Sequence, residues 1–270
     1  MLFVLSPAKT LDLSPAPVEV VGTRPELTTE ANRLAAVVKR LKAADLRRLM
    51  DVSESLADLN VQRHQSLDLK KPADAAPAAL MFAGDVYVGL DARSLDLADL
   101  EWSQDRLRIL SGLYGVLRPL DLIQPYRLEM GVRLATDRGA TLYDFWGDRL
   151  AKALKKAAQG HEDPTIVNLA SQEYFGAVDA RALKAPVVTC VFREERDGLS
   201  RTLSFFAKRA RGLMARYAIL NRLESAHDLK SFDVDGYRFD QGSSTATEWV
   251  FSRPQPEPKA AAAQTEDAAL

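Results

Sequence analysis

The chain has 270 residues, 47% of them hydrophobic and 27% charged, and a formal net charge of -1. This apolar content is enough for a sizeable core, so the composition excludes a disordered chain. The near-zero charge gives no overall reason to bind an anion, so any nucleic-acid site must come from locally clustered Lys and Arg. No segment approaches the length of a membrane span, and the first apolar run is too short for a signal peptide. We therefore expect a soluble, cytoplasmic protein.

Metal and redox chemistry find little support in the sequence. The three histidines, His64, His161 and His227, stand far apart, with no cysteine or carboxylate at metal-ligand spacing. The single cysteine, Cys190, lies in the apolar run 187–192 and is expected to be a buried, inert thiol. No phosphate-binding loop, dinucleotide fingerprint or nucleophile elbow occurs. We predict no metal and no cofactor, and the absence of reaction motifs favours a non-enzymatic function.

The first hundred residues predict a buried strand followed by helices. Leu2–Leu5 is a strand-like apolar run, and the loop after it carries Lys9, in a position favoured for ligand contacts. Apolar residues recur at helical spacing over 25–41, and further helices are expected from 44 and from 53. The segment 79–82 fits either a short strand or a helix end.

The stretch 100–131 organises the chain. Apolar spacing predicts a helix over 100–110, with Ser103 as a capping residue, and two glycines, Gly112 and Gly115, precede a new apolar run. The pattern predicts a helix-hairpin-helix element. Its glycines could let backbone N–H groups approach a phosphate, and Arg108 and Arg118 flank the turn. The alternative is a plain turn between helices whose arginines face water.

The next elements suggest an edge of polar residues. A helix is predicted from Tyr143 to about Ala158, followed by a strand over 165–169. Asn168, Ser171 and Glu173 follow this strand and could belong to an enzyme's loop, although turn and cap chemistry explains such residues equally well.

A hairpin and a basic helix are predicted next. Strands over 187–192 and 199–206 flank the turn residues Asp197 and Gly198. Residues 207–220 read as a helix rich in cations and free of acids. Because cations near a helix N-terminus oppose the helix dipole, this segment suggests an anionic partner, with a solvated basic face as the alternative. A strand pair over 232–239 and 248–251 follows, and 254–270 is expected to be a disordered tail.

Six motifs in a fixed order make the chain resemble the YaaA family of bacterial peroxide stress resistance proteins, up to about Arg253. They are residues 5–12 (LSPAKTLD), 84–90 (GDVYVGL), 111–131, 142–146 (LYDFW), 168–175 (NLASQEYF) and 206–214 (FAKRARGLM). The resemblance implies a cytoplasmic protein that protects cells from hydrogen peroxide, is associated with lowered free iron, and binds DNA through an α+β fold with a helix-hairpin-helix element.

We predict one α+β domain over 1–253, with a mixed sheet surrounded by helices. The first functional hypothesis is a DNA-binding stress protein that contacts the phosphate backbone with little sequence specificity and needs no obligate protein partner. Its predicted binding residues are Lys9, Arg108, Gly112, Gly115, Arg118, Arg127, Lys208, Arg209, Arg211 and Arg216. The second is an enzyme or small-molecule binder that holds a phosphate-bearing ligand in a basic cleft. The third is a protein-interaction factor in iron handling.

Overall fold

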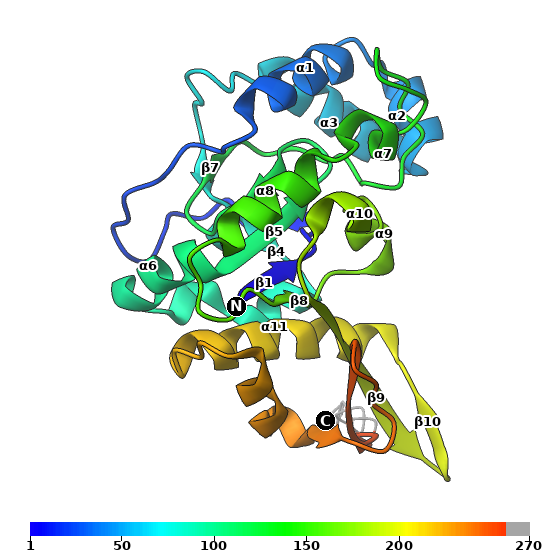
Figure 1. Ribbon diagram of the computed structural model, residues 1–270. Helices are drawn as coiled ribbons and strands as arrows, with labels where there is room; N and C mark the ends of the chain where they lie inside the picture. The colour runs from blue at the N-terminus through cyan, green and yellow to red at the C-terminus, as the bar shows by residue number, and fades with distance from the viewer. Residues whose placement is uncertain (258–270) are drawn as a thin grey trace, which may run out of the picture.

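A mixed eight-stranded sheet runs through the computed structural model, which describes residues 1–257 (Figure 1). Its order is β11-β12-β9-β8-β1-β5-β6, with β10 paired to β9. The strands are β1 (Leu2–Leu5), β5 (Leu107–Ser111), β6 (Gly115–Leu117), β8 (Ile166–Asn168), β9 (Val187–Arg196), β10 (Leu199–Arg201), β11 (Arg238–Asp240) and β12 (Glu248–Pro254). The small pairs β2 (Thr10–Leu11) with β4 (Phe82–Ala83) and β3 (Ala76–Pro77) with β7 (Leu122–Ile123) complete the strands. The predicted single-domain α+β fold with a mixed sheet is confirmed.

The centre of the sheet is parallel and completely buried. β1 lies between β5 and β8, with Phe3 opposite Leu107 on one side and Val167 on the other. Every residue of β1 is buried, because helices or loops cover both faces of a central parallel strand. That is why Leu2–Leu5 is a continuous apolar run without alternation.

Helices cover both sides of the sheet, with α1, α2, α3 and α8 on one side and α11 on the other (Figure 1). Their bounds are α1 (Thr28–Val38), α2 (Ala43–Met50), α3 (Glu54–Ser66), α4 (Ala78–Met81), α5 (Asp85–Leu90), α6 (Leu97–Arg106), α7 (Leu142–Trp146), α8 (Arg149–Ala158), α9 (Gln172–Phe175), α10 (Ala180–Leu183) and α11 (Ser204–Leu220). Short 3₁₀ turns are η1 (Ala92–Ser94), η2 (Ala226–Ser231) and η3 (Val234–Gly236). None of the helices within residues 1–257 combines the length and apolar character needed to span a bilayer.

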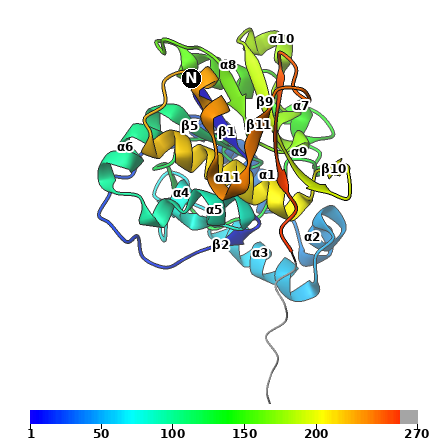
Figure 2. The same cartoon turned by 90° about the horizontal axis from the view of Figure 1, so that it is seen from below.

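Two glycines set how closely α11 packs on α5 (Figure 2). A Cβ atom at Gly212 would overlap the carbonyl oxygen of Val86, and one at Gly89 would overlap the carbonyl oxygen of Arg209. The two helix backbones therefore touch directly, which only residues without a side chain permit. This contact ties the basic helix to the segment that follows β4.

The predicted helix-hairpin-helix at 100–131 is wrong. α6 is capped by Asp96 and ends at Arg106, after which β5 and β6 form an antiparallel β-hairpin around Gly115, whose φ is +78°. Pairing of β5 with β1 outweighs the helical spacing of its apolar residues, because this segment is buried inside the sheet. Two consecutive helices with a short turn do occur elsewhere: α2 and α3 pack together and are joined by residues 51–53.

Several predicted boundaries also move. The helix expected from 143 to 158 is two helices, α7 and α8, because Gly147 adopts a φ of +51° between them. The predicted strand 199–206 stops at Arg201, and α11 begins at Ser204. The hairpin turn at Asp197 and Gly198 is confirmed, since both have positive φ. Pro254, placed in the tail by the sequence, is the last residue of β12, whereas 258–270 lie outside the described residues.

Candidate functional site

The glycines of the predicted phosphate-binding turn are interior residues. Gly112 and Gly115 are buried. A Cβ at Gly112 would overlap the carbonyl oxygen of Leu128, and one at Gly115 would lie 2.7 Å from the ring of Trp146. Trp146 Nε1 also donates to the carbonyl oxygen of Gly112 over 3.0 Å. In this structure the two glycines make room for neighbouring chain rather than for a phosphate group.

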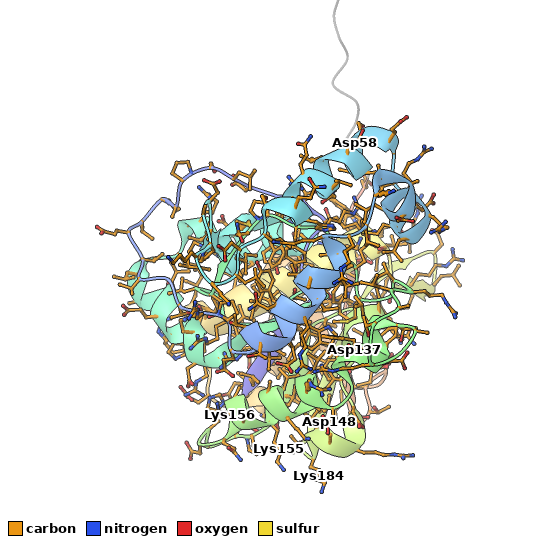
Figure 3. The ribbon with its side chains drawn as sticks, turned by 90° about the horizontal axis from the view of Figure 1, so that it is seen from above. Asp58, Asp137, Asp148, Lys155, Lys156 and Lys184 are labelled. Atoms are coloured by element: carbon orange, nitrogen blue, oxygen red, sulfur yellow. The ribbon has the colours of Figure 1, made fainter. Side chains whose placement is uncertain are left out.

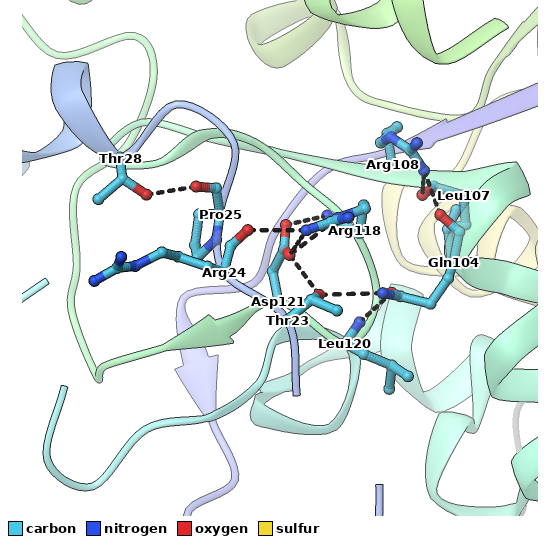
Figure 4. A network of polar contacts seen from close by, with 10 residues as sticks. All are labelled: Thr23, Arg24, Pro25, Thr28, Gln104, Leu107, Arg108, Arg118, Leu120 and Asp121. Carbon is cyan, nitrogen blue, oxygen red and sulfur yellow. Dashed lines mark hydrogen bonds and ion pairs between the residues drawn. The ribbon is translucent and has the colours of Figure 1, made fainter. Parts of the chain in front are cut away.

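The arginines that flank this turn are held by internal contacts (Figure 4). Arg108 is buried and donates to the carbonyl oxygens of Gln104 and Leu107 over 2.7 and 2.8 Å. Arg118 donates to Asp121 Oδ1 from Nε and Nη2 over 3.1 and 2.9 Å. Asp121 is fully buried and also accepts from the Arg118 backbone N–H over 2.8 Å. Both arginines therefore brace the β5–β6 hairpin.

Helix α11 forms as predicted, but contacts within the protein engage most of its cations. Arg209 pairs with Asp235 at 3.3 Å. Arg216 donates to the carbonyl oxygens of Leu90 and Asp91 over 3.1 and 2.9 Å. Its positive charge there interacts favourably with the negative, C-terminal end of the α5 dipole. Arg211 is largely buried beside Cys190. Within residues 1–257, Lys208 alone of the four α11 cations is exposed and has no carboxylate within 4.0 Å.

The remaining two predicted residues, Lys9 and Arg127, meet at one carboxylate. Lys9 Nζ lies 2.7 Å from Glu129 Oε2, and Arg127 Nη2 lies 2.9 Å from Glu129 Oε1. The Glu129 side chain is only 17% exposed, whereas that of Lys9 is 63% exposed. Glu129 thus holds Lys9 in place while most of the lysine side chain stays open to solvent.

The loop after β8 joins the same region. Ser171 N donates to Ser6 Oγ over 2.8 Å, which links the loop after β8 to the loop after β1. Glu173 Oε1 accepts from Gly131 N over 2.9 Å. Asn168 turns away, since its side chain donates to Thr189 Oγ1 and accepts from Ala170 N. Ser171 and Glu173 thus contact the loop that carries Lys9 and the segment that carries Glu129, respectively. Asn168 instead accepts a hydrogen bond from the backbone of its own loop.

A cavity of about 1120 Å³ opens beside this cluster. Helices α1 and α2 form one wall, and the segment that begins at Glu129 forms the other. Its lining residues are Val37, Arg40, Leu41, Asp45, Arg48, Leu49, Met50, Asp51, Glu129, Gly131, Val132, Arg133, Leu134, Ala135, Thr136, Asp137 and Glu173. The cavity carries acidic as well as basic residues, and of Lys9, Asn168, Ser171 and Glu173 only Glu173 lines it.

A basic segment that the sequence patterns did not single out covers residues 39–48, KRLKAADLRR, in the turn after α1 and along α2. Five cations and one acid, Asp45, occur in these ten residues, and all five cations are exposed. Within residues 1–257 only Arg48 has a carboxylate within 4.0 Å, at 3.0 Å from Asp45. The run of Lys and Arg was visible in the sequence, but helical periodicity had assigned it to packing helices.

Burial shifts the pKa values of Cys190 and His64, two side chains capable of redox or acid–base chemistry. Cys190 is 1% exposed, as predicted, and burial raises the pKa of its thiol to about 12. His64 is also buried, and desolvation lowers the pKa of its imidazole to about 4. Its Nε2 lies 3.1 Å from the carbonyl oxygen of Arg127. Neither group is poised to react at neutral pH.

The geometry defines an α+β protein with a charged cleft at the carboxyl edge of its central strands and a basic helical segment beside that cleft. A family model described as peroxide stress protein YaaA matches residues 1–243. Similar proteins include the UPF0246 proteins of Phenylobacterium zucineum (61% identical over 99% of this chain and 100% of the relative), Caulobacter vibrioides (59%; 95% and 100%) and Dinoroseobacter shibae (56%; 97% and 98%). The chain belongs to the peroxide stress protein YaaA family.

Proposed function

We propose that this protein acts in peroxide stress by binding the phosphate backbone of DNA through the basic segment 39–48. The observation that carries the proposal is the set of five exposed cations on α2 and the turn before it, four of them without a carboxylate within 4.0 Å among residues 1–257. Lys and Arg that are not neutralised internally are the groups that release counterions from DNA. On α11, the surface expected from the sequence, Lys208 is the only exposed cation without a carboxylate within 4.0 Å among residues 1–257.

The expected binding has little sequence specificity. Residues 39–42 form the turn after α1, and residues 43–48 belong to α2. Cations on such a surface supply contacts to phosphates rather than to base edges. The tip of the α2–α3 turn carries Asp51 and Glu54, which repel a phosphate and so favour contact along α2 instead. The proposal therefore places the DNA along the exposed side of Lys39, Lys42 and Arg47.

The test compares two variants of equal charge loss. The first replaces Lys39, Lys42 and Arg47 by Ala. The matched control replaces Lys155, Lys156 and Lys184 by Ala. These three residues lie at the bottom of the view in Figure 3, whereas α2 and α3 lie at the top. Mobility shifts with unrelated duplexes at several salt concentrations should show weaker binding of all duplexes by the first variant. Its plot of log affinity against log salt should flatten by roughly one unit for each lost contact.

Equal effects of both variants would reduce the proposal to general attraction between a polyanion and surface lysines. Full retention of affinity by the first variant, with a folded protein by circular dichroism, would refute it. A further variant, Lys208→Ala, tests the surface that the sequence suggested, because this residue is exposed.

In this proposal, the lowered free iron that the family resemblance implies is a consequence of DNA binding. Cells that carry the Lys39, Lys42 and Arg47 variant should lose both peroxide protection and the iron effect. Loss of protection with an unchanged iron level would separate the two properties and contradict this order of events.

A further inference from the structure

The order in which strands are added to the sheet changes side between β1 and β8. After β1 it continues to β5 on one side, whereas β8 lies on the other side of β1 and leads on to β9. The loops that leave the carboxyl ends of β1 and β8 therefore diverge. In open sheets with parallel strands, ligands bind in the crevice at such a switch point.

These two loops are tied together at their base and present charged groups farther out. The hydrogen bond from Ser171 N to Ser6 Oγ joins them. Beyond it, Lys9 meets Glu129 from the first loop, and Glu173 meets Gly131 from the second. Residues distant in sequence thus converge on one short segment, 129–131, that lines the cavity.

Cations and carboxylate oxygens in this region remain available to a ligand. Lys9 uses one contact, to Glu129, and its side chain remains 63% exposed. Arg40 and Arg133 line the cavity, are exposed, and have no carboxylate within 4.0 Å among residues 1–257. Glu173 uses Oε1 for Gly131, and its Oε2 accepts no hydrogen bond from the described residues. The cavity lining thus offers two cations without a carboxylate partner among residues 1–257, Arg40 and Arg133, with Lys9 nearby on Glu129. It also carries the carboxylates of Asp51, Asp137 and Glu173, which have oxygens that accept no hydrogen bond from the described residues.

We infer that the cavity at the β1–β8 switch point binds a small phosphate monoester that carries hydroxyl groups, no larger than a mononucleotide. Arg133 and Arg40 line the cavity and supply charge for the phosphate. Lys9 adds charge from beside Glu129, its partner in the lining. Glu173 accepts a hydrogen bond from a ligand hydroxyl. Val37, Leu41 and Val132 form apolar wall for a ring. The volume of about 1120 Å³ is at the upper end for small-molecule pockets, so a mononucleotide fits with room for water.

This inference goes beyond DNA binding, because it concerns a free ligand in a cavity. The cavity shares Arg40 and Arg48 with the segment 39–48, whereas Lys39, Lys42 and Arg47, the residues proposed to lie along the DNA, do not line it. The shared chemistry is the sugar phosphate, which also occurs in the DNA backbone. A terminal phosphate monoester distinguishes the two sources, since an internal DNA phosphate is a diester.

The experiment is calorimetric titration of the full chain with ribose 5-phosphate, adenosine 5′-monophosphate and inorganic phosphate, in a buffer free of phosphate. Binding of at least one of the two sugar phosphates with a dissociation constant below about 1 mM is expected. Lys9→Ala should weaken binding of all ligands that bind the parent by tenfold or more. Glu173→Gln should weaken the sugar phosphates at least fivefold while changing inorganic phosphate less than twofold. Lys156→Ala, on the exposed face of α8, serves as the control and should match the parent.

The inference is wrong if neither sugar phosphate binds the parent more tightly than about 1 mM. It is also wrong if folded Lys9→Ala and Glu173→Gln both titrate like the parent. A mobility shift in saturating ribose 5-phosphate separates this site from the DNA surface: unchanged DNA affinity supports a separate site. Displacement of DNA would overturn that claim. Because the calorimetry contains no DNA, its result stands even if the proposed DNA binding fails.

Discussion

Replacing Gly212 by Ala tests whether the direct backbone contact between α5 and α11 holds the fold together. Helix propensity alone predicts a gain of about 1 kcal/mol, because Ala is the better helix former. The structure predicts the opposite. The new Cβ would lie 2.6 Å from the Leu90 nitrogen and closer still to the carbonyl oxygen of Val86, whereas real Cβ atoms essentially never approach within 3.0 Å.

Both obstructing atoms belong to backbone, so no side-chain rotation relieves the overlap and the helices must separate. Overpacking of this kind costs roughly 1–3 kcal/mol, and more where backbones must move. We expect a net loss of about 2 kcal/mol or more, which lowers the melting temperature by roughly 4–8 °C for a chain of this size. Gly89→Ala, on the other helix, should behave alike, because its Cβ would overlap the carbonyl oxygen of Arg209.

The assay is urea and thermal unfolding followed by circular dichroism. Ala36→Gly, on the exposed face of α1, measures the propensity effect by itself and should cost about 1 kcal/mol. If Gly212→Ala is as stable as the parent, or more stable, propensity dominates and the close approach of the two helices is not a constraint in solution.

Three further predictions concern buried polar groups. Arg253→Met should cost about 3 kcal/mol in urea unfolding, because it leaves the fully buried Glu194 carboxylate, now 3.5 Å from Arg253 Nε, without a cation; an unchanged midpoint would contradict this. His64 has a folded pKa of about 4, below its ordinary value of 6.5, so only the unfolded chain takes up its proton as the pH falls. The free energy of unfolding should therefore drop by about 3 kcal/mol between pH 6.5 and 4, and His64→Gln should flatten that dependence. Cys190→Ser should retain peroxide protection in cells, because burial raises the pKa of the thiol to about 12 and keeps it from oxidant; loss of protection in a stable variant would make Cys190 a sensor.

Local patterns in the sequence determined the elements whose own residues decide their conformation. Leu2–Leu5 is apolar throughout and became the buried central strand. Asp197 and Gly198 tolerate positive φ and became the hairpin turn. The burial of Cys190 followed from its apolar strand, and the ordered motifs were sufficient to predict the YaaA family.

The tertiary structure alone decided where the charged residues point and what the glycines do. Residues 107–110 have helical spacing, yet pairing with β1 makes them a strand, because burial between strands outweighs local preference. Arg118 and Arg216 carry the same charge as Lys39, but long-range folding brings them to the carbonyl oxygens of Arg24 and of Leu90 and Asp91, and it leaves Lys39 in solvent. The convergence of Lys9, Glu129 and Glu173 has the same origin. Lys9 and Glu173 follow the parallel neighbours β1 and β8, whose carboxyl ends lie at one edge of the sheet, and both contact the segment 129–131.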